Sequence, residues 1–206
     1  MPLEKPAETQ FPIHELIRRR WSPRAYSARR VDPSHLGSLL EAARWGASCF
    51  NQQPWHFLVT TQDEPESFNR LLNCLMEGNK VWAQRAPVLM LSVAKLTFDE
   101  GGQPNRHALH DVGFAMGNLC AQATALGLVV HQMAGFDMAK AREAFQIPDG
   151  YEPVAAIAVG YQDDLAVLSE KLQAKERVPR RRKPLNAFVF GETWGIPARS
   201  IPPSRG

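Results

Sequence analysis

Apolar residues recur every three or four positions along much of the chain, a pattern that predicts helices with one buried face. The longest such stretch keeps one face apolar up to Gly127, so we expect the central buried helix there. Pro12 suits the first turn of the first helix, and Asp32 and Pro33 provide a cap and a first-turn residue for the second, which Gly46 ends. The predicted helices cover residues 11–20, 33–46, 68–75, 107–126 and 137–145.

Short apolar runs rich in β-branched and aromatic residues lie between these helices and predict strands. The first four runs cover residues 55–61, 87–95, 128–130 and 154–161. Residues 162–183 then form a polar, charged arm, and the apolar run 186–190 predicts a last strand. Because this strand lies beyond a long arm, we expect it to pair with another subunit rather than with its own sheet.

The composition favours one globular domain with a full hydrophobic core. The chain has 206 residues, 44% hydrophobic and 22% charged, and we expect residues 1–10 and 196–206 to be flexible tails. It has no apolar run of membrane-spanning length and no signal-peptide core, so we expect a cytoplasmic protein without membrane contact. Three widely spaced cysteines predict reduced thiols, and a net charge of +3 is too mild for a nucleic-acid-binding protein.

Two arginine-rich segments near the two ends of the chain are candidate phosphate sites. The first is Arg18–Arg24, which carries a serine among its arginines, and the second is Arg180–Lys183. Guanidinium forks match phosphate oxygens bidentately, and a serine hydroxyl adds a neutral donor. For the first segment, the alternative is that arginines near a helix C-terminus complement its dipole while staying solvated. For the second, the alternatives are a solvated basic run and a weak nucleic-acid patch.

Two further segments have the composition of a binding site for a planar ligand. The loop from Gly46 to Trp55 combines small residues, which allow close approach to the backbone, with amides that match ring carbonyls and nitrogens. The segment from His131 to Asp137 leads into a helix, where backbone amides are free to donate. A polar loop and a simple N-cap at Asp137 are the alternatives for these segments.

Several common sites are missing from the sequence. It contains neither G-x-G-x-x-G after a strand nor G-x-x-x-x-G-K-[ST], and it has no G-x-S-x-G elbow. His107 and His110 lack a carboxylate partner at motif spacing, so we expect no metal site.

Five motifs in order, together with the apolar helix that carries Asp111 and Gly113, resemble the nitroreductase family of flavoproteins from about Phe11 to Trp194. These motifs are RRRWSPRAY, GASCFNQQPWHFLV, GLVVHQMAGFD, EPVAAIAVGY and RRRKPL. The resemblance implies an α+β fold, with a central and mainly antiparallel sheet flanked by helices. It also implies an intertwined homodimer that binds FMN at the subunit interface.

The resemblance implies that Arg20, Ser22 and Arg24 contact the FMN phosphate and ring edge, with Trp21 contributing its backbone. Arg180 and Arg182 match the late basic pair of the family on the same phosphate.

The remaining matches lie along the flavin ring. Ala47, Ser48 and Cys49 match a loop that passes the flavin from the other subunit, and Asn51 matches a polar position beside the ring. Asn79 matches a contact near the pyrimidine edge, where the counterpart of a family lysine is either Lys80 or Trp82. The segment whose backbone amides reach flavin N5 and O4 matches Gln132, Met133, Ala134 and Gly135.

The implied activity is a ping-pong reduction in which NADH or NADPH delivers hydride to the flavin and a nitroaromatic, quinone or similar small molecule then takes the electrons. A transiently stacked nicotinamide needs no dinucleotide-binding motif, in agreement with the missing fingerprint. Phe50 and residues 97–110 are candidate acceptor-side surfaces, with a structural role as the alternative. The competing functions are reductive dehalogenation or flavin fragmentation on the same fold, and a basic phosphate- or nucleic-acid-binding module.

Overall fold

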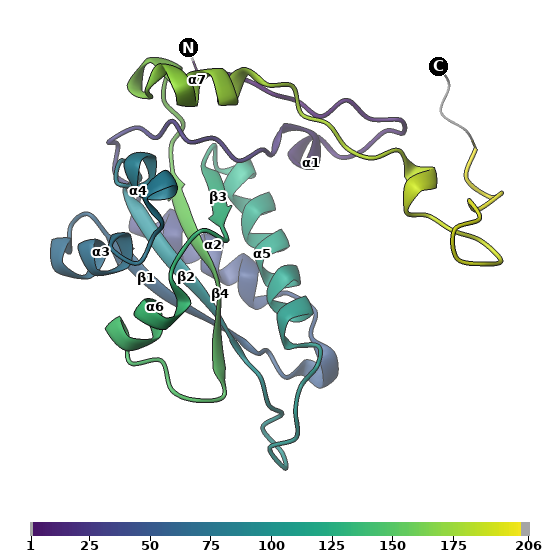
Figure 1. The fold of residues 1–206 in the computed structure, drawn as a ribbon, viewed down its shortest axis with the longest axis horizontal. Coiled ribbons are helices and arrows are strands. Elements are labelled where there is room, and N and C mark those ends of the chain that lie inside the picture. Colours follow the sequence, from purple (N-terminus) through teal and green to yellow (C-terminus); the bar gives the residue numbers. More distant parts are fainter. Residues whose placement is uncertain (1, 203–206) are drawn as a thin grey trace.

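A four-stranded antiparallel sheet forms the centre of the molecule (Figure 1), as seen in a computed structural model that describes residues 2–202. Its strands are β1 (Trp55–Thr61), β2 (Val88–Lys95), β3 (Val129–Met133) and β4 (Tyr151–Gly160), in the order β1-β2-β4-β3. All neighbouring pairs are antiparallel. The four predicted strands are therefore confirmed, although β3 extends three residues further and β4 begins three residues earlier than predicted.

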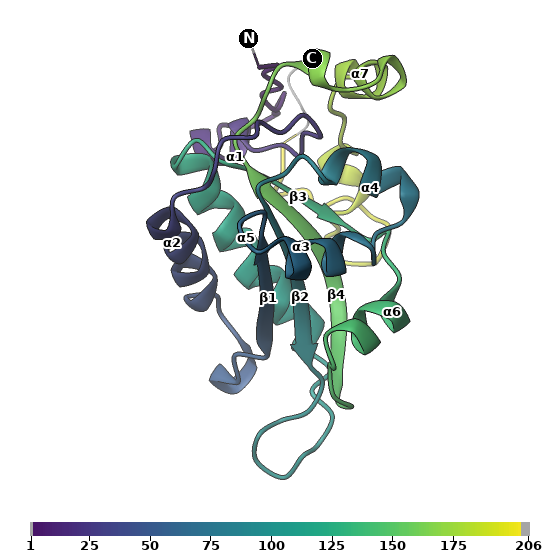
Figure 2. The ribbon, with the colours of Figure 1, turned by 90° about the vertical axis from the view of Figure 1, so that its left-hand side faces the viewer.

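Two helices cover one face of the sheet. The long helix α5 (Ala108–Ala125) packs on β2 and on α2 (Pro33–Arg44), and Figure 2 shows α5 behind the strands. Val112, Ala115 and Leu119 are fully or almost fully buried in α5, together with Leu39 of α2. This confirms the prediction of a central buried helix and the predicted cap at Asp32, whose side chain accepts a hydrogen bond from the backbone of Ser34.

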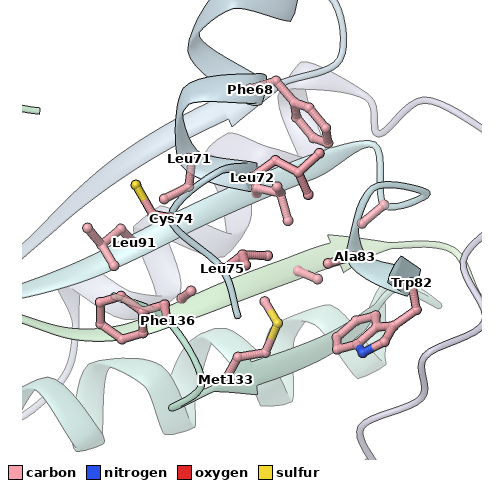
Figure 3. Close-up of a cluster of buried hydrophobic side chains, with 14 of the residues drawn as sticks. Phe68, Leu71, Leu72, Cys74, Leu75, Trp82, Ala83, Leu91, Met133 and Phe136 are labelled. Atoms are coloured by element: carbon pink, nitrogen blue, oxygen red, sulfur yellow. The ribbon is translucent and has the colours of Figure 1, made fainter. Parts of the chain in front are cut away.

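The opposite face is covered by three short helices, α3 (Pro65–Leu72), α4 (Glu77–Ala83) and α6 (Met138–Ala144). Their buried side chains meet in the cluster of Figure 3, to which Phe68, Leu75, Trp82 and Met133 contribute. The predicted helix over 68–75 lies earlier, over Pro65–Leu72, and α4 was not predicted. Its sequence, EGNKVWA, has too few apolar positions to show a helical period.

The predicted first helix over residues 11–20 is wrong in extent. Only α1 (Glu15–Arg19) is helical, and Pro12 lies before its N-cap, His14. None of its residues is buried, and the side chains of Ile13 and Ile17 are 40% and 58% exposed. The apolar side of this segment has no core to pack on within the chain, so the first turns gain too little burial to form a longer helix.

The predicted last strand over 186–190 is also wrong within this chain. The polar arm contains the short helical turn η2 (Leu165–Val167) and the helix α7 (Glu170–Arg177), and a further turn, η3 (Leu185–Ala187), occupies the site of the predicted strand. Phe190 forms a single bridge to Pro197. We refer to residues 178–202 as the C-terminal arm, which runs away from the sheet (Figure 1) and has no neighbouring strand to complete a ladder.

The N-terminal segment lies beside α7. Leu3 packs against the core, the Ala7 amide donates to the Arg18 carbonyl at 2.8 Å, and Lys5 Nζ donates to the Glu176 carbonyl at 2.7 Å. The flexibility of residues 1–10 and 196–206 stays a prediction, and Met1 and residues 203–206 lie outside the described residues. Among the described residues, no helix is both long and apolar enough to cross a membrane.

Candidate functional site

The two arginine-rich segments meet in the folded chain, at the junction of α1 and the C-terminal arm. Arg180 Nη1 donates to the backbone carbonyls of Lys5 at 2.7 Å and Arg18 at 3.1 Å. Burial, followed by the charges of Arg20 and Arg182, lowers the pKa of the Arg180 guanidinium. We call Arg20, Arg180 and Arg182 the arginine cluster. Residues 160 positions apart in sequence therefore concentrate positive charge at one place.

The arginine cluster has no carboxylate to neutralise it. Within residues 2–202, none of its three guanidinium groups forms an ion pair, and Arg20 Nη1 donates only to the hydroxyl of Ser22, at 3.3 Å. Like charges held together without a counter-charge raise the local affinity for an anion. The arrangement fits a phosphate dianion, which guanidinium and hydroxyl donors both match.

Arg24 differs from the other predicted phosphate contacts. Its Nη1 donates to Glu176 Oε1 at 2.6 Å and its backbone amide donates to Glu176 Oε2 at 3.1 Å. The Glu176 side chain is only 1% exposed. Trp21, another predicted contact in the first segment, is buried, which suits a backbone contribution. The burial of Glu176 was not predicted, because a charged residue in a polar stretch of sequence carries no signal of burial.

A pocket of about 450 Å³ lies between Arg20, one member of the arginine cluster, and the end of β3. Arg20 and Gln132 both line it, and the adjoining wall is α5, which presents Gly113, Gly117 and Cys120. Its volume lies within the range of about 300–1,000 Å³ that is usual for small-molecule sites. A larger cavity of about 1030 Å³ also includes Arg20 but opens toward residues 2–6 and Tyr161 instead. Only the first one joins both predicted halves of a ligand site.

The thiol of Cys120 lies inside this pocket. Gln132 Nε2 donates weakly to Cys120 Sγ at 3.9 Å. Burial raises the pKa of the Cys120 thiol, which the nearby charge of Arg20 opposes. The wall is therefore apolar and uncharged where a flat ring would lie against it.

Asn79 and Gly135 are in direct contact, as their common assignment to the ring requires. Asn79 Nδ2 donates to the Gly135 carbonyl at 3.0 Å, and the Met76 amide donates to the same oxygen at 3.0 Å. A Cβ at position 135 would lie 2.6 Å from Asn79 Nδ2, so a side chain there would displace the Asn79 amide from its present position. Of the neighbouring predicted residues, Met133 is buried in the core and Ala134 is exposed.

Lys80 and Trp82, the two candidates for the pyrimidine edge, differ in accessibility. Trp82 is fully buried, with ring centroids 6.1 Å from Tyr26 and 4.6 Å from His131. Lys80 is partly exposed, follows Asn79 directly, and lies 3.7 Å from a carboxylate oxygen of Glu77. Lys80 is therefore the one whose side chain is accessible to a ligand.

The loop that carries Ala47, Ser48, Cys49 and Asn51 lies elsewhere in the same chain. The Cys49 amide donates to the buried Asp111 Oδ2 at 2.9 Å, and Ser48 Oγ accepts from the Gln53 amide at 3.0 Å. Asp111 lies in the first turn of α5, whereas Cys120 lies nine residues further along that helix, a rise of about 14 Å. One chain therefore does not bring this loop to the arginine cluster.

The backbone of this loop is unusual. Phe50, Asn51 and Gln53 have φ angles of 50°, 54° and 48°, in the left-handed region that side chains other than glycine and asparagine rarely adopt. Phe50 is 85% exposed, and its ring meets Phe98 of the 97–104 hairpin with centroids 6.2 Å apart. Strain of this kind persists where the surroundings fix the loop and clusters at functional sites.

Known proteins with a similar sequence or fold show the family of the chain. The sequence model of the nitroreductase family matches residues 17–161. An uncharacterized 15.4 kDa protein of Mycolicibacterium smegmatis is 36% identical over 132 residues, which cover 64% of this chain and 87% of that protein. The major NAD(P)H-flavin oxidoreductase of Aliivibrio fischeri is 27% identical over 188 residues, covering 72% and 86%.

A solved structure described as an oxidoreductase containing FMN is 34% identical in sequence and superimposes with a TM-score of 0.86. The match covers 91% of this chain and 95% of that one. The antiparallel sheet with helices on both faces is thus the α+β fold that the resemblance implied. The chain belongs to the nitroreductase family of oxidoreductases.

Proposed function

We propose that the chain binds FMN and uses NADH or NADPH to reduce small electron-poor molecules such as nitroaromatics or quinones. The observation that carries this proposal is the gathering of Arg20 and Arg182 around Arg180, with none of the three in an ion pair within residues 2–202, next to a pocket that Arg20 lines together with Gln132. A phosphate at one end and a flat ring at the other match the two parts of FMN. The FMN-containing structure and the flavin oxidoreductase described above support the same assignment.

The proposed roles follow the geometry of the pocket. Arg20, Ser22, Arg180 and Arg182 hold the phosphate, and the backbone of Trp21 adds to this end. At the other end the segment 132–135 directs backbone amides at the ring, and Asn79, fixed against Gly135, lies at the pyrimidine edge. By holding the phosphate, the arginines would also position the ring, although they do not contact its reacting atoms.

A second copy of the chain completes the proposed site. The loop with Ala47, Ser48, Cys49 and Asn51 is held away from its own arginine cluster, so we propose that it serves the flavin of the partner in a homodimer. Apolar side chains left uncovered in one chain support this assembly, because a second chain would bury them. They are Ile17, Leu109, Phe114, Phe188 and Trp194, which are 47–88% exposed.

Bound FMN would supply two-electron transfer from NADH or NADPH to an acceptor, in two half-reactions at the same site. The protein binds and orients the ring and keeps its surroundings apolar, and we assign no acid or base side chain to the reaction. The loop with Phe50 is the proposed acceptor side. A cytoplasmic location stays a prediction from the sequence.

Flavin content tests this proposal. The purified protein should be yellow, or should become so on addition of FMN, with one FMN per chain retained through gel filtration. A colourless protein that fails to retain added FMN would refute it. Nucleic-acid binding measured over a salt series should be weak and independent of sequence, whereas tight binding would favour the phosphate-binding alternative.

A further inference from the structure

Glu176 is a buried carboxylate that the proposed flavin chemistry does not use. Both of its oxygens accept hydrogen bonds from Arg24, one from the guanidinium and one from the backbone amide, across 152 positions of sequence. An isolated buried charge is costly, so such a group is retained only where it is paired, as here. The pair joins α7 to the segment that carries Arg20 and Ser22.

Lys5 extends this connection from α7 to the C-terminal arm. Its Nζ donates to the carbonyls of Glu176 at 2.7 Å and Val178 at 2.6 Å, at the end of α7 where carbonyl groups lack helical partners. The carbonyl of Lys5 in turn accepts from Arg180 Nη1 at 2.7 Å. Through these hydrogen bonds, Lys5 holds the end of α7 and the side chain of Arg180 close together.

The contacts of Glu176 and Lys5 therefore fix the position of Arg180 relative to α7. It is four residues beyond Glu176, and its guanidinium also donates to the Arg18 carbonyl, next to Arg20. Burial and the charges of Arg20 and Arg182 act against its protonated form, as its lowered pKa records. Some contact must keep the repelling groups together before any anion binds.

We propose that Glu176 is a positioning residue for the FMN phosphate. Its ion pair with Arg24 holds α7 and the start of the C-terminal arm in the place from which Arg180 and Arg182 reach the phosphate beside Arg20. Arg24 is the other member of this ion pair and does not bind the phosphate. This inference rests on the proposed binding of FMN.

Whether Glu176→Gln weakens or strengthens FMN binding distinguishes a positioning role from a purely electrostatic one. Removing the negative charge of Glu176, which pairs with Arg24 and lies near Lys5, makes this region more positive, so electrostatics alone predicts unchanged or tighter binding of a dianion by Glu176→Gln. The positioning role predicts the reverse, because Arg180 and Arg182 lose their fixed place. Riboflavin, which has the same ring but no phosphate, reports on the rest of the site.

The test compares dissociation constants for FMN and riboflavin, measured by quenching of flavin fluorescence on the full-length apoprotein. Glu176→Gln should weaken FMN binding about tenfold or more, the loss expected for one charge-assisted contact, and leave riboflavin binding unchanged. Glu41→Gln is the control, because it removes an equal charge from an exposed pair with Arg44. It should change neither constant. If Glu176→Gln does not fold, Glu176→Asp keeps the charge, shortens its reach and should show the same selective loss.

Three results would overturn the inference. FMN binding that is unchanged or tighter in Glu176→Gln would leave the carboxylate without a positioning role. Equal weakening of FMN and riboflavin would show a general effect on the fold. Wild-type protein that binds neither flavin would refute the proposed function itself, and this outcome is recognised before any variant is made.

Discussion

At the scale of residues, the identity of a side chain says less about its role than its partners do. Arg20 and Arg24 stand four positions apart in one motif, yet only Arg24 has a carboxylate partner, the buried Glu176. Arg18 likewise pairs with Glu15, at 3.3 Å. An arginine whose charge is already compensated has little left to offer an anion, which favours Arg20 over Arg24 as a phosphate contact.

Loss of two members of the arginine cluster should release FMN. Each guanidinium makes charge-assisted contacts worth about 1.5–3 kcal/mol, so Arg20→Ala with Arg182→Ala should weaken FMN binding by about a hundredfold or more. Arg70→Ala is the control, because Arg70 lies over the ring of Phe145, 5.7 Å from its centroid, in another part of the molecule. Equilibrium dialysis measures the effect. Equal retention of FMN by both variants would show that the phosphate site is misassigned.

His131 should make stability depend on pH. Burial lowers the pKa of its imidazole, and the hydrogen bond with the Pro23 carbonyl, 3.0 Å away, opposes this only in part. The unfolded chain then takes up a proton near pH 6.5, whereas the folded chain does so only at lower pH. The free energy of unfolding should therefore fall as the pH drops from about 6.5 through the lowered pKa of the folded state.

Urea denaturation at several pH values measures this dependence. His131→Gln should flatten the fall in this window, whereas His107→Gln, at an exposed position, should keep the wild-type slope. The same slope in His131→Gln and wild type would assign the acid sensitivity to other groups.

At the scale of elements, the sequence pattern predicted those parts whose burial is complete within one chain. α5 and the four strands pack against the core of their own chain, so apolar residues recur at helical spacing in α5 and form continuous runs in the strands. α4 escaped prediction because only Trp82 and Ala83 anchor it. The segments 11–20 and 186–190 carry apolar residues that remain exposed in this chain. Their apolar pattern therefore did not predict elements that pack on the core of the chain.

The candidate site could likewise be predicted only in part from the sequence. The family motifs identified Asn79, Gly135 and the arginines by position, but the meeting of Arg20 with Arg180 depends on the whole fold. The role of Glu176 could not be predicted, because burial of a charge is decided by distant partners. In the proposed homodimer, the place of the loop with Cys49 relative to the flavin is set by the second chain, which one chain's sequence pattern does not report.

Removal of the C-terminal arm should separate assembly from folding. Within the chain, the hydrogen bonds of residues 184–202 join them mainly to one another, for example the Gly191 amide to the Ile196 carbonyl at 2.9 Å. A chain that ends at Lys183 should therefore keep its melting transition but become monomeric, since it loses Phe188 and Trp194 as subunit contacts. Light scattering after gel filtration measures the mass. A stable dimer of this shortened chain would show that the residues beyond Lys183 are not needed for subunit contact.

At the scale of the whole molecule, the fold separates a rigid scaffold from the parts that make the site. The sheet and its two layers of helices form the scaffold, and the arginine cluster lies at one end of α5 while the strained loop with Phe50 lies at the other. A homodimer that joins these two ends across α5 would give two equivalent sites, each with groups from both chains.

The central claim is that this molecule passes electrons from a nicotinamide through bound flavin to an acceptor. Anaerobic stopped-flow absorbance tests it most directly. NADH or NADPH should bleach the oxidised flavin band of the FMN-loaded protein, and a later addition of a nitroaromatic or quinone should restore it without further nicotinamide. Protein with bound FMN that neither NADH nor NADPH bleaches would contradict the account.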